Sequence, residues 1–383
     1  MNYRVAIVGI GWYGYRPVTP EVSYKEMVYQ AAVRAYADAG VDPRKDIESF
    51  ITVAEDFHEG TSIFDEYTPD QLGAALKPMH TIAGDGLHGL ATGYMLIRTG
   101  QFDLVAVEGH SKASNILTLP EVTAYAQDPI LNRPLRMNTH FIAGLEMNRF
   151  LFETGTTPEQ CAAVVVKNRR NALKNPAAAY GANLTIDEIL NSPPISWPLG
   201  KRDTAEEADG AIVMVLASER LASNLTDQPV WILGAGWCND TPSLENREWG
   251  RIPYVEQAAR MAYRQAGINH PQDTIGFAEV DDTYSYKELQ SLEALGLINP
   301  GEAGLLTEAG FTAADGDLPV NVSGGSLGSG HLLDATGLAR ALEVVVQLRG
   351  QAGARQLEGV QTGLAQSWRG VPTTSGAVLV LAN

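Results

Sequence analysis

The chain repeats itself at an offset of 227 residues, and this repeat limits the possible folds more than any other feature. The segment VAIVGIGWYG at 5–14 matches VWILGAGWCN at 230–239, and the segment at 30–50 matches the one at 257–277. Gln30 aligns with Gln257, which sets the offset (257 − 30 = 227). Solenoid repeats recur every roughly 20–50 residues. A repeat of this length therefore indicates two duplicated domains.

Both halves read as buried strands that alternate with helices, which predicts an α/β fold with central sheets. Apolar residues recur at helical spacing before Gly40 and again before Gly267, so we predict that each glycine ends a helix. We place the first half at 1–228 and the second at 229–383. A loop domain at about 112–200 is inserted in the first half. Within it, Thr157, Pro158 and Gln160 predict a capped helix start.

Charge and hydropathy exclude several classes of function. The formal net charge of −17 argues against a nucleic-acid-binding surface. No apolar run approaches the roughly 18–20 residues that span a bilayer. The N-terminus lacks the cationic start and cleavage site of a signal peptide. Cys161 and Cys238 give neither a disulfide framework nor a metal-ligand spacing. We expect a cytoplasmic protein with no membrane segment, nucleic-acid partner or metal.

Two glycine-rich stretches predict sharp turns from a strand into a helix. One is HTIAGDGLHGLATG at 80–93, and the other is NVSGGSLGSGHLLDATG at 321–337. A residue on such an elbow lies at a helix N-terminus, which favours developing negative charge. The two stretches resemble the thiolase superfamily, in its sterol-carrier/archaeal acetyl-CoA acetyltransferase branch. That family reads roughly A-C-A-S-G-x-x-A at the first elbow, with the cysteine as the acyl-accepting nucleophile.

The resemblance implies a fold, a substrate and an assembly. The two duplicated βαβαβ halves are expected to pack into a five-layer α-β-α-β-α core, and the protein to be at least a homodimer. The substrate is expected to be a coenzyme A thioester (an acyl-CoA), with no covalently bound cofactor. In thiolases the loop domain holds coenzyme A, so we predict phosphate contacts from the basic residues of that domain or an ordinary solvated helix face. The predicted CoA-binding residues are Lys167, Arg169, Arg170, Lys201 and Arg202.

The nucleophile position is the first departure from the family pattern. Gly86 occupies the place of the cysteine, and His88 follows it at the start of the elbow helix. A thioester is attacked readily by a thiolate, which glycine does not supply. Cys161 and Cys238 do not follow an elbow, so we interpret both as packing residues. The acyl-cysteine route is therefore expected to fail in this chain alone.

The remaining family positions supply the candidate catalytic residues. Asp281, Asp282 and Tyr284 lie where the family reads H-D-C-F or N-E-A-F, and they are candidates for acid/base catalysis or for a polar strand end that caps the next helix. His331 falls on the histidine that activates the family nucleophile. The glycine-rich turn around it is Asn321, Gly324, Gly325 and Gly330.

Two functions from different classes fit this pattern. In the first, the chain acts on acyl-CoA thioesters without an acyl-cysteine, as in retro-aldol cleavage of a β-hydroxyacyl-CoA, which needs a base for the hydroxyl and stabilisation of the enolate. Some thiolase-like aldolases work beside a small zinc-ribbon/OB-fold subunit. In the second, the chain is a non-catalytic or half-site subunit that pairs with a cysteine-bearing thiolase paralogue.

Overall fold

The fold is taken from a computed structural model, which describes residues 4–55, 58, 63–241 and 243–383. The first half contains the following elements: β1 (Val5–Arg16), α1 (Tyr24–Ala39), β2 (Ser49–Val53), α2 (Phe64–Tyr67), α3 (Pro69–Leu72), β3 (Met79–Ile82), α4 (Gly86–Arg98), β4 (Leu104–Lys112), β7 (Asp209–Ser218) and α9 (Glu219–Leu225). The second half contains β8 (Val230–Asn239), α10 (Pro253–Ala266), α11 (Pro271–Thr274), β9 (Phe277–Glu279), α12 (Ser285–Ala294), α13 (Ala303–Glu308), α14 (Gly325–Ser329), η5 (Leu333–Ala335), α15 (Thr336–Leu348), η6 (Gly353–Arg355), β10 (Thr362–Trp368) and β11 (Ser375–Ala382).

The strands form one nine-stranded sheet in the order β3-β2-β4-β7-β1-β8-β11-β10-β9. The order β2-β4-β7-β1 of the first half recurs as β9-β10-β11-β8 in the second, as the sequence repeat predicts. A short antiparallel pairing of β1 with β8, Ala6 with Trp231 and Ile7 with Val230, joins the halves. The two sheets expected from the family resemblance therefore join edge to edge into one continuous sheet.

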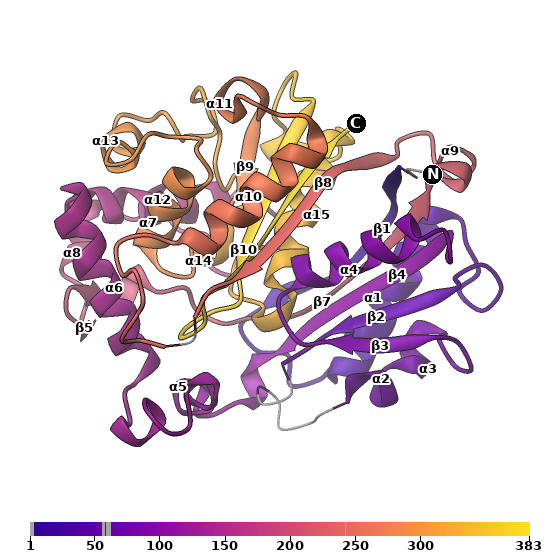
Figure 1. The fold of residues 1–383 in the computed structure, drawn as a ribbon, viewed down its shortest axis with the longest axis horizontal. Helices are drawn as coiled ribbons and strands as arrows, with labels where there is room; N and C mark the ends of the chain where they lie inside the picture. Colours follow the sequence, from indigo (N-terminus) through magenta and orange to yellow (C-terminus); the bar gives the residue numbers. More distant parts are fainter. Residues whose placement is uncertain (1–3, 56–57, 59–62, 242) are drawn as a thin grey trace.

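Two helices lie between the sheet portions, which gives the expected five-layer core. α4 packs against β2 and β4 of its own half and against β8 and β11 of the other. α15 packs against α4 and against β10, β9, β11 and β7. On the outside, α1 covers β1 and β7, while α10 lies along β8 and β11 (Figure 1). The α/β fold with central sheets, predicted from the repeat, is confirmed, and its five layers are those that the family resemblance implies.

The local signals that predicted helix ends are also confirmed. Gly40 ends α1 and Gly267 ends α10, both in the left-handed region with φ of 66° and 71°. In the loop domain, α7 (Pro158–Ala172) starts at Pro158. The Thr157 side chain accepts from the Gln160 backbone, and Gln160 completes the predicted capping box. These ends follow from contacts within four residues, which is why the sequence alone shows them.

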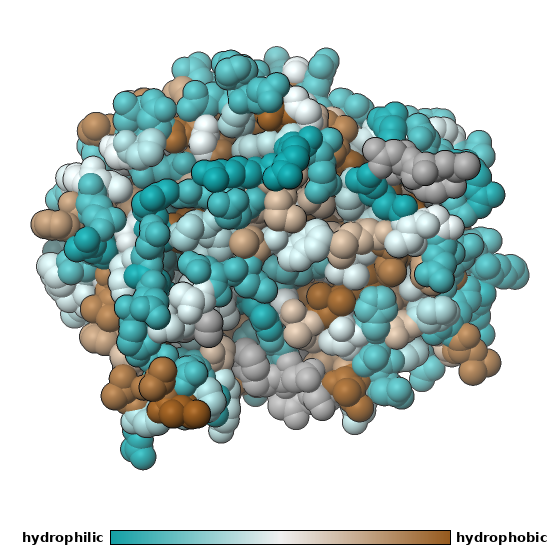
Figure 2. Space-filling view, in the orientation of Figure 1, coloured by the Kyte–Doolittle hydropathy of each residue, from teal (hydrophilic) through white to brown (hydrophobic). Residues whose placement is uncertain are grey.

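The inserted segment forms two long helices, α6 and α7, several short ones and a two-stranded sheet. Its elements are η1 (Ala113–Asn115), α5 (Leu119–Thr123), η2 (Ala124–Ala126), η3 (Arg133–Leu135), α6 (Thr139–Thr154), α7, α8 (Ile186–Leu190), β5 (Pro194–Ser196), β6 (Leu199–Gly200) and η4 (Lys201–Asp203). Its α5 arm, residues 113–138, extends from the body at the lower left of Figure 1. Apolar side chains gather there in Figure 2, and Ile130 and Leu135 are 80% and 63% exposed. In the part of the chain that the structure describes, we find no helix with the length and apolar character of a membrane span.

Candidate active site

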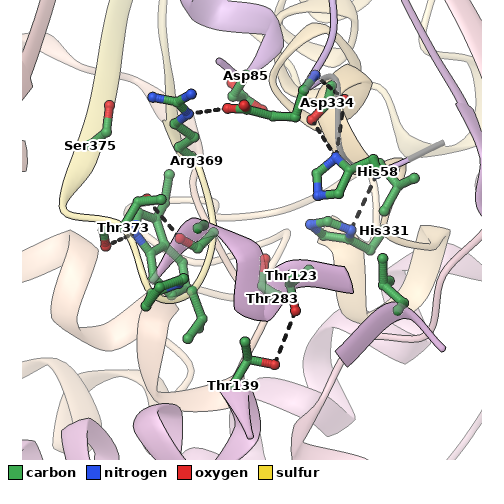
Figure 3. Close-up of a pocket in the computed structure, with 18 of the residues that line it drawn as sticks. His58, Asp85, Thr123, Thr139, Thr283, His331, Asp334, Arg369, Thr373 and Ser375 are labelled. Carbon is green, nitrogen blue, oxygen red and sulfur yellow. Dashed lines mark hydrogen bonds and ion pairs between the residues drawn. The ribbon is translucent and has the colours of Figure 1, made fainter. Parts of the chain in front are cut away.

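A cavity of about 400 Å³ lies where the two halves and the loop domain meet. The first half contributes Glu55, His58 and Asp85, and the α5 arm contributes Leu119, Pro120, Thr123 and Ala126. The second half contributes His331 and Asp334, Thr283 and Tyr284, and the segment from Trp368 to Ser375. Figure 3 shows these side chains converging on one space from elements far apart in sequence. Of the predicted catalytic residues, the cavity brings together His331 and Tyr284.

The first elbow is built from a capping aspartate and a close backbone contact. Asp85 caps α4 by accepting from the Leu87 backbone at 3.0 Å, and it also accepts from the Gly337 backbone of α15 at 2.8 Å. One carboxylate thus serves the N-termini of both central helices. A Cβ on Gly86 would lie 2.4 Å from the Leu338 nitrogen. The elbow as folded has no room for a side chain at position 86.

Burial sets the protonation of Asp85. The side chain is nearly fully buried, and desolvation raises the pKa of Asp85 to about 6, although the nearby Arg340 cation opposes this rise. Because Asp85 also lines the cavity, its carboxyl is a titratable group of the site. Sequence reasoning passed over Asp85. The available signal was its N-cap position directly before the elbow glycine.

His331 lies on the turn that follows α14, half-buried at the cavity wall. Its Nδ1 accepts a hydrogen bond from the Leu333 backbone at 3.3 Å. Desolvation lowers the pKa of His331 to about 4, with Asp281 opposing the change and Arg340 adding to it. The imidazole is therefore neutral near pH 7.

The other members of the glycine-rich turn shape it from behind the cavity wall. Asn321 adopts a positive φ of 52°, and its Oδ1 accepts from the Val280 backbone at 2.8 Å. Gly325 also has a positive φ, and a Cβ there would lie 2.0 Å from Asp282 Oδ2. With Gly324 and Gly330, also at positive φ, these residues hold the turn rather than line the cavity.

A second histidine, His58, lies beside His331 in the cavity lining (Figure 3). His58 Nδ1 lies 3.0 Å and 3.2 Å from the two Asp334 oxygens, and the side chains of this pair are only 10% and 11% exposed. Asp334 also accepts from the Glu55 backbone at 2.8 Å, and the Glu55 side chain pairs with Arg369. Sequence reasoning named neither His58 nor Asp334 as a site residue.

Tyr284 lines the cavity and packs among other aromatic side chains. Its ring lies 6.0 Å from Tyr286 and 6.5 Å from Trp368, centroid to centroid. Its hydroxyl lies 3.3 Å from His140 Nδ1. Burial raises the pKa of Tyr284 above its usual value, so the phenol keeps its proton near neutral pH. It is therefore a hydrogen-bond donor.

Asp281 and Asp282 turn away from the cavity and towards a buried cation. Arg340 of α15 lies 2.9 Å from Asp281 Oδ2 and 3.8 Å from Asp282 Oδ1. Asp282 also accepts from the Ser326 and Leu327 backbones at 2.6 Å and 3.1 Å, at the start of α14. Desolvation raises the pKa of Asp282 to about 6. Asp282 thus bonds the start of α14 rather than the next helix along the chain, α12, and Asp281 forms an ion pair.

Of the side chains predicted to contact coenzyme A, some are paired with other residues of the protein and the others are exposed. Lys167 pairs with Glu288 at 3.0 Å and donates to the Val320 carbonyl at 2.7 Å. Arg169 pairs with Glu206 at 3.0 Å and donates to the Tyr180 carbonyl. Both are therefore engaged inside the protein. Arg170, Lys201 and Arg202 are exposed.

The sulfur atoms and His88 lie outside the cavity lining. Cys161 is fully buried in the loop domain, where desolvation raises the pKa of its thiol. Cys238 lies at the end of β8, and its Sγ donates to the Asn239 carbonyl at 3.6 Å. His88 contacts the cavity indirectly, with Nε2 at 3.2 Å from Ser375 Oγ.

Comparisons with known proteins agree with this geometry. A family model described as thiolase C-terminal domain-like matches residues 238–383. Acetyl-CoA acetyltransferase from Methanothermobacter thermautotrophicus is 32% identical over 380 residues, covering 97% of each chain. Sterol carrier protein 2 from Oryctolagus cuniculus is 29% identical, covering 94% of this chain and 69% of its own. The solved Ltp2-ChsH2(DUF35) aldolase superimposes with a TM-score of 0.85 at 26% identity, covering 99% of this chain and 97% of its own.

Proposed function

The chain belongs to the thiolase superfamily, and from this premise we propose that it acts on acyl-CoA thioesters without an acyl-cysteine, as a retro-aldolase on a β-hydroxyacyl-CoA. The observation that carries the proposal is the composition of the cavity wall. Three histidines and a tyrosine line it, and the described residues around it include no cysteine. The described lining of the cavity therefore offers side chains that can transfer protons, but no thiol that could act as a nucleophile.

Two further observations support a route without a covalent intermediate. Gly86, which the family resemblance puts at the nucleophile position, faces the Leu338 backbone with no space for a side chain. The thiol of Cys161 is buried with a raised pKa, which suppresses the thiolate that acyl transfer requires. One solved relative carries the name aldolase, and carbon–carbon cleavage is the chemistry that this name describes.

The cavity supplies the stabilisation that retro-aldol cleavage needs. In the step, the β-hydroxyl loses its proton, the bond between Cα and Cβ breaks, and its electron pair forms the enolate of the thioester. Neutral His331 and the neutral phenol of Tyr284 are hydrogen-bond donors at the wall, suited to the enolate oxygen. Asp281 and Asp282 support the site indirectly by holding Arg340 and the α14 turn.

Exposed basic and apolar side chains suggest where coenzyme A and a partner subunit bind. We assign the coenzyme A phosphates to the exposed Arg170, Lys201 and Arg202, since Lys167 and Arg169 are already paired. The α5 arm lines the cavity and exposes Ile130 and Leu135, which supports a partner subunit at its mouth. The aldolase relative has a second component, ChsH2, in its name. We further propose a homodimer, with cytoplasmic location.

The decisive assay combines purified protein, with any co-purified partner, and two substrate classes. A panel of 3-hydroxyacyl-CoAs tests cleavage to a carbonyl compound and a shortened acyl-CoA, and a panel of 3-ketoacyl-CoAs with free coenzyme A tests thiolysis. We expect cleavage of the first panel only. If neither class reacts until a cysteine-bearing thiolase subunit is added, the chain is instead a half-site subunit of a heteromeric complex.

A further inference from the structure

The hydrogen bonds of His331 and His58 place the ring proton on a different nitrogen in each histidine. His331 Nδ1 accepts from the Leu333 backbone N–H, so the nitrogen that carries the proton in the neutral ring is Nε2. His58 Nδ1 lies against the Asp334 carboxylate, which only accepts, so His58 carries its proton on Nδ1. His331 therefore presents a donor at Nε2, and His58 presents an acceptor at Nε2.

The position of Asp334 supports a dedicated orienting role. Its carboxylate accepts from the Glu55 backbone at 2.8 Å, which holds it against the His58 ring. Both the aspartate and the histidine line the cavity. A histidine held by a buried carboxylate through Nδ1 has its tautomer and orientation set and its protonated form stabilised, as in catalytic triads.

We propose that His58, oriented by Asp334, is the general base of this site and that His331 is the donor to the enolate oxygen. The inference rests on the proposed retro-aldolase function and assigns the base that this function requires. Asp334 acts as a positioning residue, because it touches His58 rather than the reacting atoms.

The proton and electron balance of the step closes within the site. His58 Nε2 takes the proton of the β-hydroxyl, and the oxygen forms the new carbonyl as the Cα–Cβ bond breaks. The electron pair of that bond passes to the thioester enolate, whose oxygen accepts a hydrogen bond from His331 Nε2. Protonated His58 then returns the proton to Cα, which gives the shortened acyl-CoA. No oxidant, reductant or co-reactant is consumed.

The charged surroundings of His58 have both signs. His331 and Asp334 lie beside His58, and Glu55 and Arg369 form the adjoining ion pair. Asp85, Glu207 and Asp240 also line the cavity. Asp334 is the carboxylate that contacts His58 Nδ1, so its replacement most directly changes the base.

Kinetics of single variants with the 3-hydroxyacyl-CoA panel test the assignment. His58→Gln should lower kcat by roughly 10²–10⁴, the usual contribution of a general base, with KM changed less than threefold. Asp334→Asn should lower kcat and shift the pH profile, because an amide can donate to Nδ1 and favour the other tautomer. His270→Gln, at an exposed histidine, is the matched control and should behave as wild type.

A second readout is independent of turnover. In the protein labelled with 15N at histidine, the His58 resonances are identified by their loss in His58→Gln. We expect the Nδ1–H tautomer in the wild type and a shift towards the Nε2–H tautomer in Asp334→Asn.

The outcomes separate this inference from the function on which it rests. An active wild type with an equally active His58→Gln variant would overturn the assignment of the base and leave the retro-aldolase function standing. An Nε2–H tautomer of His58 in the wild type would overturn it on structural grounds. A wild type inactive on the whole panel, with its partner present, would remove both.

Discussion

Replacing Gly86 with alanine tests whether the elbow is closed to any side chain. In the structure the added Cβ would lie 2.4 Å from the Leu338 nitrogen and 2.7 Å from Leu338 Cγ. Ordinary contacts begin at 3.4 Å, so α15 and α4 must separate by about 1 Å locally (3.4 − 2.4 Å). Because the nearest atom belongs to the backbone, no side-chain rotation relieves the overlap.

The expected loss of stability follows from two opposing effects. Overpacking a close contact costs about 1–3 kcal/mol. Alanine recovers up to about 1 kcal/mol through its higher helix propensity, and less at the first turn of α4. We therefore expect Gly86→Ala to lower the free energy of unfolding by about 1–2 kcal/mol, and Gly86→Cys to lower it at least as much while restoring no thiolysis.

Urea unfolding followed by circular dichroism, with midpoints compared at a common slope, measures the effect. Gly14→Ala is the matched control, because an added Cβ there meets nothing within 4 Å and should change stability by less than about 0.5 kcal/mol. A Gly86→Ala variant as stable as the wild type would show that the elbow can open. Thiolysis by Gly86→Cys would show that the family mechanism needs only the missing sulfur.

Three other perturbations have defined outcomes. Cleavage should survive iodoacetamide and the Cys161→Ala, Cys238→Ala double variant, and inactivation that acyl-CoA prevents would show that a cysteine acts. Coenzyme A affinity, measured by calorimetry, should fall with salt and in Arg170→Glu with Arg202→Glu, since exposed charges are screened beyond about 8 Å at physiological ionic strength, and unchanged affinity would exclude these side chains. The raised pKa of Asp85, about 6, means that its contribution to stability is fully present below about pH 4 and is lost as pH rises through 6. Asp85→Asn should therefore gain stability relative to wild type between pH 4.5 and 7 in urea titrations, and a constant difference would show that Asp85 does not titrate there.

The fold could be predicted from the sequence because the patterns that indicate it are either local or present in both halves. The capping boxes and C-cap glycines depend on residues three or four apart, and the repeat shows the order of strands twice. The β1–β8 junction was not readable, since it consists of two residue pairs that no pattern marks.

Only part of the candidate site could be predicted from the sequence, because the roles of its other residues depend on contacts with residues far away in the chain. His331 and Tyr284 stand out through the family motifs, and both line the cavity. His58 gains its role from Asp334, which is 276 residues away. The basic residues of the loop domain look alike in sequence, yet Glu288 and Glu206 engage Lys167 and Arg169 and leave Arg170 exposed.

The position of β7 has a consequence for synthesis on the ribosome. β7 lies between β4 and β1, and it is made only after the whole inserted segment, about 100 residues after β4 ends (218 − 112 = 106). At the usual elongation rate this leaves β1 without its partner strands, and β4 without its partner on the side away from β2, for roughly 5–20 s. During that interval these strand edges are open to other chains. A nascent chain stopped near residue 200 should therefore aggregate or bind chaperones, whereas one released past residue 218 can close its first sheet.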